Sequence, residues 1–389
     1  MIADVSQVDP KRQLRLLALL IPALACFGLT VYVVDQAAWA CWLTPVLSFV
    51  VVPALDRWIG ADRSNPPESA IAALENDPYY QRLLVALLPL QLATTVGGSW
   101  VVVAMQPGWL DLAGLLLTVG GVNGFAIVAA HEAGHKSGRA WRWLALMELA
   151  PSAYGHFYVE HNRGHHRNVA TPADPASSRM GESFWRFLPR TMTGSLVSAW
   201  RIERQRLAGR GRGPWTLANH NLQGWLMTLL LYGGLTAWLG GTALVFLLAQ
   251  ALYAASLLEV VNYLEHYGLL RQADSAGRHV RCAPEHTWNS NHVVSNLLLY
   301  QLQRHSDHHA HASRSYQALR HFDSSPQLPS GYASMLLLAY WPPLWFAVMD
   351  PLVSRHYSAD LGRAHVEPAA RERLFARYHR PPAQAATVA

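Results

Sequence analysis

Six long stretches of the chain are rich in Leu, Val and Ala and almost free of charged residues. They cover residues 16–34, 38–55, 83–105, 112–130, 222–239 and 242–263. A helix needs about 20 apolar residues to cross the hydrocarbon core of a bilayer, and each stretch is close to that length. The pattern therefore predicts an all-α integral membrane protein with six transmembrane helices.

The basic residues lie on alternate sides of these stretches. The short connections after the first, third and fifth stretches contain no Lys or Arg, whereas Lys11, Arg12 and Arg15 precede the first stretch and eight arginines lie from Arg179 to Arg212. Because cytoplasmic segments carry the excess of Lys and Arg, both termini are expected in the cytoplasm. We expect a multi-pass protein of the cell inner (cytoplasmic) membrane.

The composition agrees with this prediction. Charged residues make up 14% of the 389 and hydrophobic residues 51%, whereas soluble proteins have about 25% charged residues. The net charge of +6 does not indicate a nucleic acid partner, because nearly all basic residues are arginines placed between apolar stretches. We expect one membrane domain over residues 1–389, with poorly ordered tails at 1–15 and 368–389.

Histidine is the residue type that carries the candidate chemistry. Sixteen of the 19 histidines lie between His131 and His321, and eight of them fall in the motifs HEAGH (131–135), HNRGHH (161–166) and HSDHH (305–309). Residues three or four apart share a helix face, so His131 with His135, His161 with His165, and His305 with His308 or His309 can each hold one ion. The adjacent extra histidines indicate two ions. A ninth histidine, His266, follows the sixth stretch, on the same predicted cytoplasmic side.

Each histidine segment also has an acidic neighbour. These candidate catalytic residues are Glu132, Glu160, Glu265 and Asp307. A metal-bound imidazole usually donates its second N–H to a carboxylate or carbonyl, which fixes the ring and strengthens the ligand. A solvated charge on a cytoplasmic helix explains any one of them equally well, and only the four together indicate that carboxylates support the metal ligands. No role is assigned to His279, His286 or His292.

The number of histidines bears on the metal. Imidazole binds Zn, Cu, Fe and Ni alike, but a structural zinc needs four ligands and a catalytic zinc three. The three cysteines, Cys26, Cys41 and Cys282, lie far apart with no C-x-x-C pair, which argues against a cysteine metal site. Two histidine-bound irons with open positions for dioxygen fit this ligand set.

Three other interpretations are weaker. HEAGH matches the H-E-x-x-H motif of zinc proteases, but such an enzyme needs one further ligand rather than two further histidine clusters. A metal transporter needs ionisable ligands deep inside its spanning helices, and Glu259 is the only charged residue well inside the six stretches. Haem ligation uses isolated histidines within helices, whereas these are clustered at helix ends.

The histidine segments resemble one family in particular. Four segments are similar to the membrane-bound non-haem di-iron alkane 1-monooxygenases (alkane omega-hydroxylases): HEAGHK (131–136), YGHFYVEHNRGHHRNVATPADPASSRMGES (154–183), NYLEHYGLLRQ (262–272) and WNSNHVVSNLLLYQLQRHSDHHAHASRSYQALRHF (288–322). This family is part of the fatty acid desaturase/hydroxylase superfamily. The resemblance implies two Fe ions and nine histidine ligands: His131, His135, His161, His165, His166, His266, His305, His308 and His309.

The resemblance also implies an activity. Members hydroxylate the terminal methyl of medium- and long-chain n-alkanes to 1-alkanols, using O2 and two electrons from rubredoxin and its NADH-dependent reductase. It suggests that bulk on the second helix limits chain length, where this chain has Val50, Val51 and Val52. Related di-iron chemistry on alkylaromatics or alkenes, and acyl-lipid desaturation, remain alternatives. The chain-length range, the oligomeric state and the particular rubredoxin are not readable from the sequence.

Overall fold

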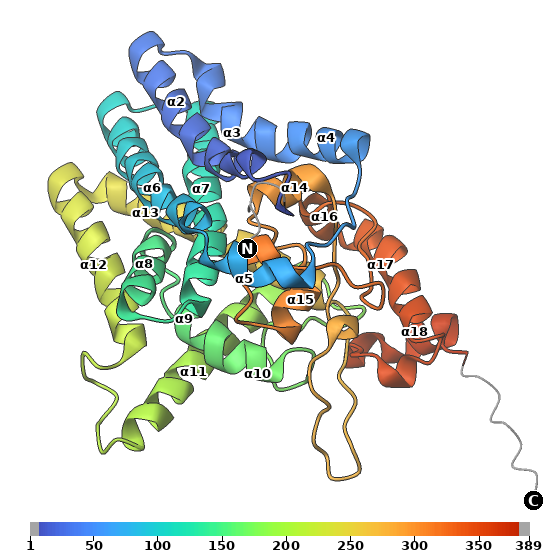
Figure 1. Cartoon of the computed structure of the whole chain (residues 1–389). Coiled ribbons are helices and arrows are strands. Elements are labelled where there is room, and N and C mark those ends of the chain that lie inside the picture. The colour runs from blue at the N-terminus through green and yellow to red at the C-terminus, as the bar shows by residue number, and fades with distance from the viewer. Residues whose placement is uncertain (1–7, 381–389) are drawn as a thin grey trace, which may run out of the picture.

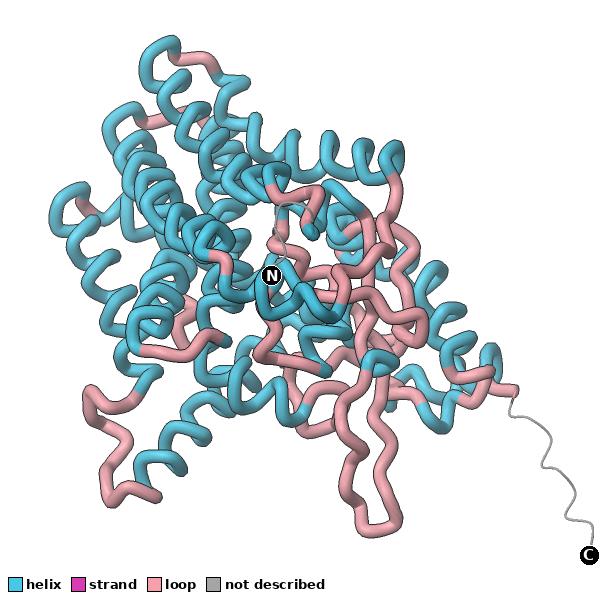
Figure 2. The backbone as a smooth tube through the Cα atoms, in the orientation of Figure 1, coloured by secondary structure: helices cyan, strands magenta, loops and turns pink. Residues whose placement is uncertain are grey.

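The structure, a computed structural model, describes residues 8–380 (Figure 1). In this range the chain forms helices joined by loops, and only isolated β-bridges occur in place of strands (Figure 2). The predicted all-α architecture is confirmed.

Five helices are long and apolar enough to cross a membrane. They are Gln13–Asp35, which includes α2 (Leu20–Asp35); Ala38–Ile59, which includes α3 (Leu43–Val46) and α4 (Val52–Ile59); α6 (Pro78–Met105); α7 (Trp109–His135); and α13 (Gly241–His266). The predicted fifth stretch forms α12 (His220–Leu239), which exposes Leu229 and Leu230 but is not among these five. The chain is a multi-pass membrane protein, and the number six stays a prediction.

Helix α7 is the centre of the bundle and packs against α6, α13 and α8 (Arg139–Leu149). Glycines bring its backbone close to α13: a Cβ on Gly120 would lie 2.9 Å from the carbonyl oxygen of Gln250, and one on Gly124 would lie 2.9 Å from the Leu257 side chain. Small residues at such crossings allow close helix packing within a membrane. This contact brings the C-terminal ends of α7 and α13 together.

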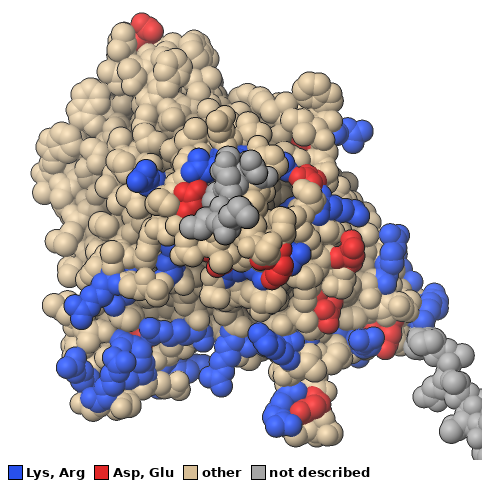
Figure 3. Space-filling view, in the orientation of Figure 1, with Lys and Arg blue, Asp and Glu red and all other residues tan. Residues whose placement is uncertain are grey.

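The remaining helices lie mainly around that end of the bundle (Figure 1). They are α5 (Ile71–Asn76), α9 (Phe157–Glu160), α10 (His166–Asn168), α11 (Phe184–Ala208), α14 (Val293–Leu298), α15 (His305–Ala310), α16 (Tyr332–Ala339), α17 (Pro342–His356) and α18 (Arg371–Tyr378). Lys and Arg side chains gather on the lower part of the molecule in Figure 3, while the upper left, over α2, α6 and α12, is nearly uncharged in this view. This distribution matches a membrane-embedded part beside a basic, water-facing part.

Both expected tails are structured where the structure describes them. Arg15 forms a buried 2.6 Å ion pair with Asp9, which also accepts a hydrogen bond from the Tyr80 hydroxyl. Residues 368–380 include α18, whose Leu374 is buried. These ends are held because they contact the helix bundle. The rest of the expected tails, residues 1–7 and 381–389, lies outside the described range.

Candidate metal centre

The nine predicted histidines come from four separate parts of the fold. His131 and His135 end α7, and His266 is the last residue of α13. His161, His165 and His166 lie in the helical segment 157–168, and His305, His308 and His309 lie on α15. Because α7 and α13 end side by side, the two shorter segments can close over both ends.

The structure brings the nine side chains together in two groups. The five-histidine group contains His131, His135, His161, His166 and His308, and the four-histidine group contains His165, His266, His305 and His309. Within each group the facing ligand atoms all lie within 4.8 Å of one another. Each group could therefore hold one metal ion, in agreement with the expectation of two.

One predicted pairing is wrong. The four-residue spacing of His161 and His165 suggested a shared ion, but the two rings belong to different groups. Residues His161–His165 form a wide π-helical turn, which brings residues five apart onto one face. The Nε2 of His161 therefore lies 3.0 Å from the Nε2 of His166.

The spacing of the nitrogens bears on whether they can share an ion. Neighbouring Nε2 atoms within the groups are 2.9–3.3 Å apart. Two nitrogens bound about 2.1 Å from an ion lie about 3.0 Å apart at a right angle and about 3.4 Å apart at the tetrahedral angle. The neighbouring nitrogens are therefore close enough to bind one ion together, in either geometry.

The chemical state of the rings also fits metal binding. Burial lowers the pKa values of His161, His305, His308 and His309 well below the usual range, so these imidazoles are neutral and keep a lone pair free. Both ring nitrogens of the buried His266 lack a hydrogen-bond partner within the described residues. Buried polar groups are normally satisfied, so this ring has an unused ligand atom.

An aspartate that the sequence analysis missed supports the four-histidine group. The Nδ1 of His165 donates to the Oδ2 of Asp174 across 2.9 Å, while its Nε2 faces His309. Burial acts to lower the pKa of His165, but the Asp174 carboxylate outweighs it and the pKa is raised. A carboxylate on the outer nitrogen is the arrangement that strengthens a metal-bound imidazole. In the sequence, the only indication of this role is that Asp174 lies within the family-like segment 154–183.

The four predicted carboxylates have different contacts. Glu132 pairs with Lys136 at 3.0 Å, and Asp307 pairs with Arg314 at 2.8 Å, so neither is brought onto a ring of the two groups. Glu160 is buried, which raises its pKa to about 8, and its Oε1 has no partner in the described part of the chain. Glu265 is the one that reaches a ring: its Oε2 lies 3.1 Å from the Nε2 of His305.

The three histidines without an assigned role lie outside both groups. The Nδ1 of His279 contacts the backbone carbonyl of Arg271, that of His286 accepts from the backbone of Ala283, and that of His292 contacts the Ser290 hydroxyl. These are local contacts within loops.

The two groups differ in access to the surface. His135 and His166 of the five-histidine group are half-buried, whereas every ring of the four-histidine group is buried. The five-histidine group is therefore the outer one.

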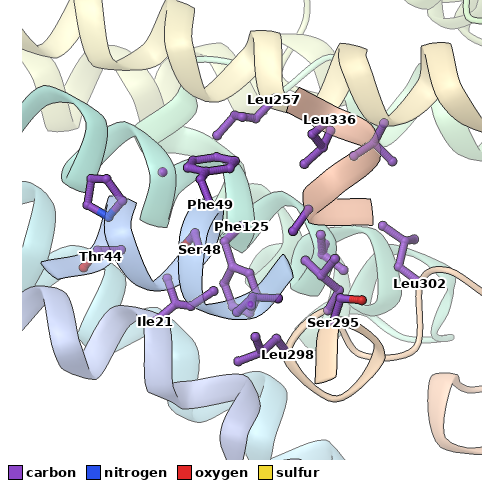
Figure 4. A pocket seen from close by; sticks show the side chains of 18 of the residues that line it. Ile21, Thr44, Ser48, Phe49, Phe125, Leu257, Ser295, Leu298, Leu302 and Leu336 are labelled. Carbon is purple, nitrogen blue, oxygen red and sulfur yellow. The ribbon is translucent and has the colours of Figure 1, made fainter. Parts of the chain in front are cut away.

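An apolar cavity lies between the helices beside the groups (Figure 4). Its wall includes Ile21, Phe49, Val52, Phe125, Leu257 and Leu336. A smaller cavity shares Val128 and Leu302 with it and reaches His131 and His308. The two cavities are therefore neighbours, and the smaller one adjoins the five-histidine group.

The contribution of the second spanning helix to this cavity differs from the expectation. Val52 is buried and lines the wall, whereas Val50 and Val51 are 62% and 38% exposed and lie outside it. A π-helical turn at Leu47–Val51 changes the helix phase just before Val52. Of the three valines, Val52 is the one that can limit a ligand.

Comparison with known proteins identifies the family. The fatty acid desaturase family model matches residues 107–350. The chain is 47% identical to an alkane 1-monooxygenase of Acinetobacter baylyi over 86% of this chain and 82% of the relative, and 44% identical to alkane 1-monooxygenase 1 of Alcanivorax borkumensis over 94% and 90%. It is also 30% identical to the hydroxylase component of a xylene/toluene monooxygenase of Pseudomonas putida, over 69% and 70%. The matched region contains the segments that position both histidine groups, and the chain belongs to the alkane 1-monooxygenase family within the fatty acid desaturase superfamily.

Proposed function

We propose that the chain hydroxylates the terminal methyl group of medium- and long-chain n-alkanes to 1-alkanols, using O2 and two electrons. One oxygen atom of O2 enters the alcohol, and the other leaves as water after taking up the two electrons and two protons. The observation that carries the proposal is the apolar cavity between the helices, next to a smaller cavity that adjoins the five-histidine group.

The cavity suits a substrate without polar groups. An alkane offers no hydrogen-bonding handle, so shape and burial must orient it. The wall is almost wholly apolar and is built from membrane-spanning helices, through Ile21, Phe49, Phe125 and Leu257. A hydrocarbon dissolved in the bilayer can enter such a space without passing through water, with one chain end toward His131 and His308.

The proposed cofactors are two iron ions. His131, His135, His161, His166 and His308 would hold one, and His165, His266, His305 and His309 the other. The all-imidazole donor set and membership of the desaturase superfamily support iron. Bound iron would supply the redox chemistry that activates dioxygen toward an unactivated C–H bond. The chain's own residues orient the rings and bury all of them except those of His135 and His166, which are half-buried.

The proposed electron donor is rubredoxin, reduced by its NADH-dependent reductase. Arg139 and Arg167 are exposed and follow His135 and His166 closely in the sequence, at the outer group. Exposed basic residues next to these histidines in the sequence would favour an acidic carrier. The same basic side supports the proposed inner-membrane orientation, with both termini in the cytoplasm.

The xylene/toluene monooxygenase relative favours a second candidate, hydroxylation of a methyl group on an aromatic ring. The same cavity and histidine groups would serve that reaction, because a methylbenzene also lacks a polar handle. Alkene epoxidation and acyl-lipid desaturation require the same ions but different substrates.

The test combines a metal assay with product analysis. The detergent-purified protein should contain about two irons per chain and should convert octane to 1-octanol with added rubredoxin, its reductase and NADH. Faster conversion of xylene than of octane would favour the aromatic substrate. One zinc per chain and no alcohol from either substrate would contradict the proposal.

A further inference from the structure

A line of buried contacts, made by polar side chains and by the backbone N–H of Tyr332, leads from the apolar cavity to the four-histidine group. At the cavity, the Nε2 of Gln303 donates to the hydroxyl of the lining residue Ser295 over 2.7 Å. The Oε1 of Gln303 accepts the backbone N–H of Tyr332 at 2.9 Å. The Tyr332 hydroxyl donates to the Oε1 of Glu265 at 2.7 Å, and the Oε2 of Glu265 lies 3.1 Å from the Nε2 of His305.

Every member of this line is shielded from solvent. Ser295, Glu265 and His305 are 1–2% exposed, and Gln303 and Tyr332 are fully buried. A buried donor or acceptor that loses its partner keeps the full cost of its desolvation. The Gln303 contact therefore fixes the backbone at Tyr332, where α16 begins, and the Tyr332 hydroxyl fixes the Glu265 carboxylate.

The cavity end of the line is anchored to the second spanning helix. Asp56 of α4 accepts hydrogen bonds from the backbone N–H groups of Val294 and Ser295 at the start of α14. The same helix provides Val52, and α14 provides Ser295, to the cavity wall. Tyr332 begins α16, whose Ala333 and Leu336 also line the cavity. The line thus connects three parts of the wall with α13.

Glu265 and Asp174 contact different histidines, and they do so through different ring nitrogens. Asp174 contacts the Nδ1 of His165, the nitrogen that points away from the group. Glu265 contacts the Nε2 of His305, the same nitrogen that lies 2.9 Å from the Nε2 of His309. Its carboxylate is therefore on the inner side of the four-histidine group.

We propose that Gln303 and Tyr332 are positioning residues that hold the Glu265 carboxylate on the inner side of the four-histidine group and fix the cavity wall relative to it. Neither residue belongs to the two histidine groups or lines the apolar cavity. The inference rests on the proposed two-metal function, and it adds two residues that control the inner ion and the depth to which the alkane reaches.

The first test measures metal binding in the absence of alkane and electron donor. The metal-depleted full-length protein is titrated with Co(II), and the two binding steps are resolved by absorption spectroscopy. Tyr332→Phe removes only the hydroxyl that orients Glu265, and it should weaken one of the two steps about tenfold, as loss of an outer hydrogen bond to a metal site does. Gln303→Met removes the amide but no aromatic side chain, and it should weaken the same Co(II)-binding step as Tyr332→Phe.

A matched control separates this effect from general loss of a buried hydroxyl. The Tyr232 hydroxyl, on α12, is also buried and donates to backbone carbonyls away from both groups. Tyr232→Phe should leave both Co(II) steps unchanged. Equal weakening of both steps by Tyr332→Phe and Gln303→Met, or no change in either, overturns the proposal. The titration needs no turnover, so its result is independent of whether alkanes are the substrate.

The second test addresses the cavity wall. Ser295→Ala and Gln303→Met each break the same hydrogen bond, so each should raise the share of 2-octanol formed from octane, and the double variant should raise it no further. Exclusive formation of 1-octanol by both single variants, or additive changes in the double variant, would show that the line does not fix the wall.

Discussion

The Nδ1 of His165 and the Oδ2 of Asp174 lie 2.9 Å apart, and both side chains are buried. Asp174 is itself held by the Ser177 hydroxyl and the backbone N–H of Ala176. The carboxylate thus has a fixed position from which it orients the ring toward His309.

Replacing Asp174 with Asn should weaken metal binding at the four-histidine group. The amide keeps a similar size but loses the charge that strengthens the imidazole, and such changes cost 10–100-fold in affinity. Iron per chain after dialysis against a chelator measures the effect. Asp307→Asn is the control, since Asp307 binds Arg314 and the backbone of Arg320 instead of a ring of the groups. Equal iron retention by Asp174→Asn and the unchanged protein would be evidence against this role.

Replacing Val52 with Trp should shorten the range of alkanes accepted. The larger side chain would enter the apolar cavity from its wall, so long alkanes would lose activity before short ones. Rates for a series of alkanes from hexane to hexadecane measure the range. Val51→Trp places the same bulk on an exposed position outside the wall and should leave the range unchanged. If only Val51→Trp shortened the range of accepted alkanes, Val51 rather than Val52 would be the residue that limits chain length.

Reversing the charge of Arg167 or Arg139 to Glu should slow turnover supported by rubredoxin by about tenfold at low salt, since electrostatic steering contributes tenfold or more to association rates. Salt should reduce the difference, and turnover with a small chemical reductant should not change. Arg212→Glu, in the exposed loop after α11, serves as the control. An equal loss in the control variant would mean that general surface charge, rather than this face, matters.

Replacing Gly224 with Ala should destabilise the protein by about 1–3 kcal/mol, as overpacking of a tight contact does. An added Cβ on this α12 residue would lie 3.0 Å from the Cα of Gly155, and neither backbone can move without shifting its segment. Thermal unfolding in detergent measures the loss. Gly233→Ala, on the same helix with nothing within 4 Å, should be neutral or slightly stabilising. A similar melting temperature for both variants would contradict the close packing.

The histidine groups were predictable from sequence because their spacing is local. His131 with His135 and His305 with His309 each share one turn of an ordinary α-helix, and the pattern therefore places them correctly in common groups. The predicted pairing of His161 with His165 was wrong, because the π-helical turn His161–His165 changes which residues share a face. The role of Val52 was obscured by the same kind of turn at Leu47–Val51.

The contacts of the carboxylates were less predictable. Some of their partners are distant in sequence, and for others a basic side chain binds the carboxylate instead of a histidine. Glu132 has a nearer cation in Lys136, and Asp307 has Arg314, so adjacency to a histidine did not decide their contacts. Asp174 reaches His165 through the turns of residues 168–177, which no periodic pattern reveals. Tyr332 meets Glu265 only because α16 packs against α13.

The half-buried His135 and His166 have a consequence for how the protein acquires and loses its ions. A chelator in water can reach the outer group through these two rings, whereas the four rings of the inner group are covered on all sides. Exchange at the two positions should therefore occur on separate timescales. A protein stripped gently should pass through a half-loaded form that retains the inner ion, and refilling the outer position should restore it without unfolding.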